Sequence, residues 1–154
     1  MSITRNKLYL TLFGVLLSAS ASAQRIHPER ITIVRDSFGV PHIYAPTDAE
    51  VAYGLAWATC EDQLEIVLRN LSRATGKGAE LYGKAGAIED YFRQFVEAEK
   101  MADIAWGQTP ADFRAVLKGY AEGLNAYAKH NDLPARRFKR LFPVRPQDLM
   151  ASYV

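Results

Sequence analysis

Cysteine is almost absent from this sequence: Cys60 is the only one among 154 residues. A lone cysteine excludes an internal disulfide framework, so the fold needs a hydrophobic core, partner contacts or both. The sequence also lacks CxxC, HExxH, Walker and G-x-S-x-G patterns. Its histidines, His27, His42 and His130, are too scattered for the local pairing of a zinc site. We therefore expect no metal or cofactor site in this chain, and we expect His42 to be a packed or hydrogen-bonded histidine rather than a general base.

No apolar run is long enough for a stable membrane span, which takes about 20 residues. The run over residues 8–17 follows a short basic start and precedes small residues that end in Ala21-Ser22-Ala23. This order predicts a cleaved signal peptide over residues 1–23, a mature chain over 24–154, and a periplasmic or secreted location. The alternatives are an uncleaved anchor and a buried N-terminal helix.

The expected mature chain also has no excess of positive or negative charge. Removal of residues 1–23 takes away Arg5 and Lys7 and no acidic residue, which lowers the formal net charge from +2 to 0. This balance does not favour nucleic acid as a partner. The basic run over residues 136–140 is interpreted as a solvated loop or helix face.

The start of the mature chain predicts a β-hairpin. Residues 31–35 alternate and are β-branched, residues 36–41 contain turn formers, and residues 42–45 form a second short strand. Gly39 is expected at positive φ, and Pro41 keeps Val40 extended.

Helical periodicity dominates the rest. A capping box at Thr47 and Glu50 predicts the start of one helix. The start of another helix is predicted by Thr109, Pro110 and Asp112. Residues 135–145 are expected to be loop. The expected helices cover residues 47–73, 79–82, 87–106, 109–130 and 145–154. The last pattern has no C-cap or polar tail, so we expect the chain to stop inside a helix of a longer protein; a short last helix is the alternative.

No catalytic, cofactor-binding or metal-binding residue is assigned. Neighbouring helical carboxylates point in different directions, so Glu61-Asp62 and Glu89-Asp90 are predicted to be surface or salt-bridge residues. Cys60 is predicted to be a buried, inert thiol. Asn70-Leu71-Ser72 matches the N-glycosylation pattern, but its expected position in the middle of a helix disfavours glycosylation there. The expected positions of Ser37, Ser72 and Ser152 do not suit a nucleophile. The aromatic stripes, with Trp57 and Trp106, are typical of core.

Residues 33–45, IVRDSFGVPHIYA, resemble the N-terminal hairpin of the penicillin acylase family of N-terminal-nucleophile amidohydrolases. Further blocks follow in the family's order over residues 31–154, although the tryptophan of the last block is absent here. They are Tyr53–Ala58 with Glu61-Asp62, Ala74–Gly76, Glu80–Gly83, Asp90–Arg93, Tyr120–Tyr127 and Pro143–Leu149.

The resemblance implies an α+β chain, mainly helical with an N-terminal hairpin, that forms part of an αββα hydrolase fold. It implies a precursor of signal, α-chain, spacer and β-chain, whose cleavage frees a serine nucleophile and leaves a heterodimer. Substrates would be small-molecule linear amides: a penicillin, an acyl-homoserine lactone or an acylated peptide. The nucleophile, the oxyanion donors and the calcium ligand of some members would lie beyond this chain, which alone would be inactive. A non-catalytic exported helical binding module, or a decayed gene fragment, is the alternative.

The signal pattern makes the first prediction. Protein purified from its native host should begin at Gln24, because cleavage follows Ala21-Ser22-Ala23. N-terminal sequencing checks this, and recovery of an intact segment 1–10 would contradict it.

Overall fold

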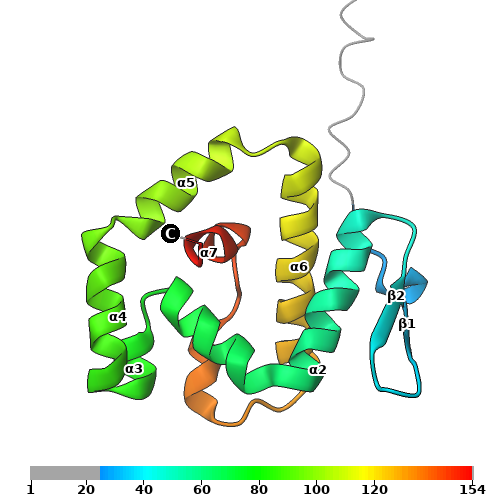
Figure 1. Cartoon of the computed structure of the whole chain (residues 1–154), viewed down its shortest axis with the longest axis horizontal. Helices are drawn as coiled ribbons and strands as arrows, with labels where there is room; N and C mark the ends of the chain where they lie inside the picture. The colour runs from blue at the N-terminus through cyan, green and yellow to red at the C-terminus, as the bar shows by residue number, and fades with distance from the viewer. Residues whose placement is uncertain (1–24, 154) are drawn as a thin grey trace, which may run out of the picture.

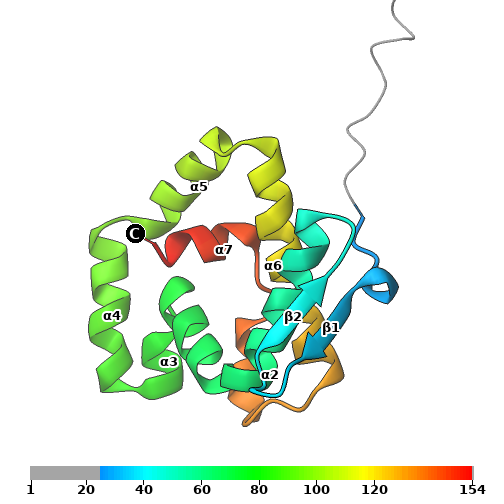
Figure 2. The same cartoon turned by 45° about the vertical axis from the view of Figure 1, so that its right-hand side comes forward.

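The computed structural model describes residues 25–153; the expected signal peptide and Val154 lie outside the described residues. The chain is mainly helical with one antiparallel hairpin, as predicted. Helices α2 to α6 form a ring in which α7 lies, with the hairpin beside α2 (Figures 1 and 2). The elements are η1 (Pro28–Arg30), β1 (Thr32–Arg35), β2 (Pro41–Tyr44), α2 (Asp48–Ala74), α3 (Gly78–Tyr82), α4 (Lys84–Phe95), α5 (Ala98–Gln108), α6 (Ala111–His130), η2 (Arg136–Leu141) and α7 (Pro146–Ala151).

The hairpin forms where the sequence predicts it. β1 pairs with β2, and Ile33 lies opposite Ile43. Asp36 closes the turn, because its Oδ1 accepts hydrogen bonds from the amides of Phe38 at 2.9 Å and Val40 at 3.0 Å. Gly39 has φ of 81°, so the expected positive φ is confirmed.

The N-cap of α2 at Thr47 is confirmed, but the Glu50 carboxylate bonds to the Thr47 hydroxyl and not to its amide, so the predicted capping box is not complete. The amide of Glu50 donates to Thr47 Oγ1 at 3.3 Å, and the Thr47 hydroxyl donates to Glu50 Oε2 at 3.0 Å. Glu50 is only 1% exposed, and its Oε1 accepts from the amide of His27 at 3.3 Å. Thr47 Oγ1 therefore caps the helix, and the buried Glu50 carboxylate fixes that hydroxyl and holds the segment before the hairpin.

Helix α2 is bent rather than continuous. Gln63 has non-helical angles, φ −143° and ψ 43°, and the two halves of α2 run in different directions (Figure 1). The apolar pattern of α2 skips from Ala58 to Leu64, so each half has its own apolar face. The first half packs beside the hairpin and α6, and the second half reaches α4 and α7.

The core forms where α2 and α6 meet at very short range. A Cβ at Gly119 would lie 2.0 Å from the carbonyl oxygen of Ala49, and one at Gly123 would lie 2.4 Å from that of Tyr53. Only glycine allows such an approach between two helix backbones. The α2 and α6 stripes therefore bury one another, as predicted for core. The largest buried members of this core include Leu68, Leu71, Leu124, Phe138 and Leu141.

The prediction of one helix over residues 87–106 is wrong. The chain forms α4 and α5, separated at Glu97, which has φ of 50°. No glycine or proline lies at this break, so no local signal marks it. The turn lets α5 pack against α7, with Ala98 and Ala102 buried. Tertiary packing has thus overridden helical periodicity. The predicted core face of α4 is largely exposed.

Three expectations about the second half of the chain also need correction. Thr109 does not cap α6: its hydroxyl donates to the carbonyl of Ala105 at 2.7 Å and so closes α5, while Pro110 is the N-cap of α6. Residues 135–145 are not all loop, because they contain η2, whose Phe138 and Leu141 are buried. The described chain does not stop inside a helix, since α7 ends at Ala151.

The start of α7 is as predicted, with Arg145 as N-cap, Pro146 in the first turn and Asp148 completing a capping box. No helix within residues 25–153 is long and apolar enough to cross a membrane.

The hairpin turn makes the second prediction. Gly39→Ala should destabilise the protein by about 1–2 kcal/mol, because a side chain disfavours the left-handed conformation. A Cβ there would have no neighbour within 4 Å, so the cost is conformational. Gly107→Ala is the matched control: its Cβ site is equally open, it lies in α5 without positive φ, and it should gain up to about 1 kcal/mol. Urea unfolding of both variants checks this, and equal effects would contradict it.

Candidate functional site

The densest polar cluster lies between the hairpin and α2. The Nη2 atom of Arg35 lies 3.0 Å from Glu61 Oε2 and 2.9 Å from Asp62 Oδ1, and its Nη1 donates to Asp62 Oδ2 at 3.1 Å. The hydrogen bonds that Arg35 donates to the carboxylates of Asp62 and Glu61 raise the pKa of its guanidinium. Trp57 Nε1 also donates to Glu61 Oε1 at 2.9 Å. Both carboxylates are thus held in ion pairs, as predicted, and they fasten the hairpin to the helix.

The histidines lie apart in the structure too. His42 Nε2 lies 3.3 Å from Asp36 Oδ2, so the prediction of a hydrogen-bonded histidine is confirmed. The amide of Val40 and the ring of His42 lower the pKa of Asp36. His27 pairs with Glu29, and His130 Nδ1 lies 2.8 Å from the carbonyl oxygen of Ala126.

The second carboxylate pair has two structural roles. Glu89 accepts from Arg73 Nε at 2.8 Å and Nη2 at 2.6 Å, and this contact lowers the pKa of Glu89. Asp90 accepts from the amides of Gly78 and Ala79 at 2.9 and 2.8 Å, so it caps α3 from the neighbouring helix. The salt-bridge prediction holds for Glu89, and sequence reasoning missed the cap that Asp90 forms.

Cys60 and Ser72 are both inaccessible. Cys60 is 1% exposed, and burial raises the pKa of its thiol to about 12. A thiol in this state is a poor nucleophile at neutral pH, as predicted. Ser72 is fully buried and donates to the carbonyl of Arg69 at 2.7 Å.

Asn125 is a structural residue that sequence reasoning missed. Its Nδ2 donates to the carbonyl of Val144 at 3.0 Å, and its Oδ1 accepts from the amide of Val144 at 2.7 Å. The signal available in the sequence was an asparagine inside a helical stripe, because asparagine disfavours helix interiors unless its amide has a partner. This pair holds the segment before α7 against α6.

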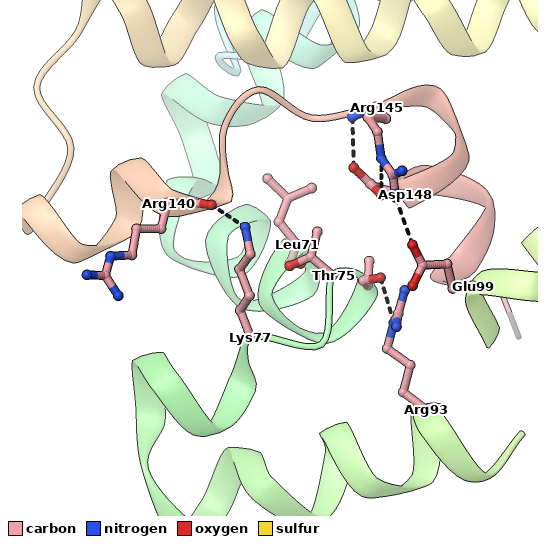
Figure 3. Close-up of polar contacts among 9 residues, drawn as sticks. Leu71, Thr75, Lys77, Arg93, Glu99, Arg140, Arg145 and Asp148 are labelled. Carbon is pink, nitrogen blue, oxygen red and sulfur yellow. Dashed lines mark hydrogen bonds and ion pairs between the residues drawn. The ribbon is translucent and has the colours of Figure 1, made fainter. Parts of the chain in front are cut away.

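A polar network then joins the second half of the chain (Figure 3). Arg145 Nη2 lies 2.8 Å from Asp148 Oδ1 and 3.4 Å from Glu99 Oε1, which links α7 to α5. Arg93 Nε donates to the carbonyl of Ala74 at 2.8 Å, and Lys77 donates to the carbonyl of Arg140. The basic side chains of the run over residues 136–140 are therefore exposed, and Arg140 contacts Lys77 and Glu80 near α3.

An apolar cavity of about 480 Å³ lies between α2, α6 and α7. Its walls include Leu55, Ile66, Val116, Leu117 and Leu149. Its one carboxylate, Asp148, is already bound by Arg145. The described residues of this cavity give it a mainly apolar surface. They include no nucleophile paired with a base. Within residues 25–153, no three His, Cys, Asp or Glu side chains gather as metal ligands.

The sequence of this chain is similar to those of known proteins. The family described as penicillin amidase matches residues 30–153. An acyl-homoserine lactone acylase (PvdQ) of Pseudomonas fluorescens is 31% identical over 138 residues, which are 82% of this chain and 18% of the relative. Penicillin G acylase of Escherichia coli is 31% identical over 127 residues, 81% of this chain and 14% of the relative.

A solved structure is similar in fold. A thermostable penicillin G acylase from Alcaligenes faecalis superposes with a TM-score of 0.61 at 23% identity, covering 80% of this chain and 69% of that one. The described residues therefore adopt part of an N-terminal-nucleophile hydrolase fold. The chain spans less than a fifth of the length of these two curated relatives. With the match over residues 30–153, the chain belongs to the penicillin amidase family.

Proposed function

We propose that residues 24–154 are the amino-terminal, α-chain part of an acylase precursor that hydrolyses the carbon–nitrogen bond of linear amides. This proposal rests on the family match over residues 30–153 and on two relatives that are both named as acylases. Their names suggest an acyl-homoserine lactone or a penicillin as substrate, and an acylated peptide is the third candidate. The signal pattern supports a periplasmic or secreted location.

Chain length supports a processed heterodimer. This chain covers 69% of the matched polypeptide in the solved structure, but only 14% of the E. coli relative. The solved polypeptide is therefore several times shorter than that relative, as expected if acylase precursors are cut into separate chains. The partner would be the β-chain of the same precursor.

The chemistry would come from the β-chain. Its N-terminal serine hydroxyl would attack the amide carbon while the serine's own amine accepts the proton and returns it to the leaving amine. Water would then hydrolyse the acyl ester. The residues described here support a scaffold role, because Arg35, Glu61, Asp62 and Asp90 are all held in contacts between elements.

The third prediction concerns activity. The product of the complete gene should release amine from phenylacetyl, long-chain acyl or homoserine-lactone amides, whereas purified chain 24–154 should release none. The matched control is the complete product with the serine at the start of its β-chain replaced by alanine, which should also be inactive. Turnover by the short chain alone would contradict the proposal, as would an inactive complete product.

The fourth prediction concerns Cys60. At pH 8 its alkylation in the folded protein should be at least about 1,000-fold slower than in urea, because the thiol pKa rises from 9.0 to about 12. Cys60→Ala should leave acylase activity intact. The pKa of this thiol is higher in the folded protein than in the unfolded chain. Its contribution to the free energy of unfolding is therefore complete below pH 9 and is lost as pH rises towards 12. Fast alkylation, or lost activity in a folded variant, would contradict an inert role.

A further inference from the structure

Helix α4 presents an apolar face that no other described element covers. Ile88 is 61% exposed, Tyr91 66%, Phe92 61% and Phe95 72%. Their spacing of three and four places them on one side of the helix. The rings of Tyr91 and Phe95 stack with centroids 6.4 Å apart, and those of Tyr91 and Phe92 meet edge-on at 6.3 Å. Exposed aromatic area on the order of 400 Å² marks an interaction surface.

This face differs from the other amphipathic helices of the chain. Helices α2 and α6 pack against each other and share a buried core that includes Leu68 and Leu124. The opposite side of α4 is also occupied, because Gly86 contacts the backbone of Gly78, and Asp90 caps α3. The side of α4 that carries Gly86 and Asp90 therefore packs on α3, and the apolar residues stay largely exposed.

The chain's end lies beside this face. A surface cavity of about 630 Å³ is lined by Ile88, Phe92 and Val96 of α4 and also by Ser152 and Tyr153. A polypeptide continuing after residue 154 would thus leave from the edge of the α4 face. The two curated relatives carry more than four-fifths of their length outside the matched region, so ample chain exists to cover it.

We propose that the α4 face, formed by Ile88, Tyr91, Phe92 and Phe95, is covered by the polypeptide that follows residue 154 in the same precursor. This rests on the proposed function, which requires such a continuation. The segment should be rich in aliphatic or aromatic residues, because the face itself has no charged side chain. Its polar edge is Arg73 paired with Glu89.

Cysteine accessibility in the purified product of the complete gene tests this. Phe95→Cys should react with a maleimide about tenfold more slowly than Gln94→Cys, because the centre of an interface excludes water. Gln94 is a matched control: it is the adjacent exposed residue of α4 and lies off the apolar face. Tyr91→Cys is the second test variant. Peptide mass mapping assigns the label to its position, and Cys60 is buried.

The outcomes separate the two proposals. Equal rates at positions 94 and 95 in the folded product of a single precursor copy would overturn the covered face and leave acylase activity untouched. Protection that disappears on dilution would indicate a second copy as the occupant, which also overturns it. Protection in the product of a single precursor copy that hydrolyses no amide would support the covered face while the proposed function fails.

Discussion

The close approach of α2 and α6 is the constraint on which the rest of the structure depends. Gly119 and Gly123 lie one helical turn apart and touch the backbone at Ala49 and Tyr53. A side chain at either glycine would force the helices apart and open the core between Leu68 and Leu124. With that contact in place, the first half of α2 holds the hairpin, and its second half can bend towards α4 and α7 (Figure 1).

Most charged side chains that could suggest chemistry instead hold elements together. Arg35 ties the hairpin to α2, Asp90 caps α3 from α4, and Arg145 joins α7 to α5. Each contact links segments that are separate in sequence, and each is satisfied within the described residues. In the described residues, these charged side chains therefore serve as structural contacts between elements.

The exposed face of α4 is the surface that we propose is covered by the polypeptide following residue 154. Helix α4 forms one side of the ring and is held by α3 and by the Arg73–Glu89 pair (Figure 2). Its polar residues Glu89 and Asp90 contact α2 and α3, whereas Tyr91, Phe92 and Phe95 are exposed. Exposed apolar area of this kind is typical of an interaction surface.

The hairpin, the N-cap of α2, the start of α7, the positive φ at Gly39, the inert thiol and the family could be predicted from the residues, because each depends on neighbouring residues or on a short motif. The bend at Gln63, the break at Glu97, the burial of η2 and the exposure of the α4 face instead depend on contacts in the folded chain. At Glu97 no glycine or proline marks the break; packing of α5 against α7 sets it. The same holds for Asn125 and Asp90, whose partners are 19 and 12 residues away. Periodicity shows that a helix has an apolar face, but what covers that face depends on contacts between distant segments.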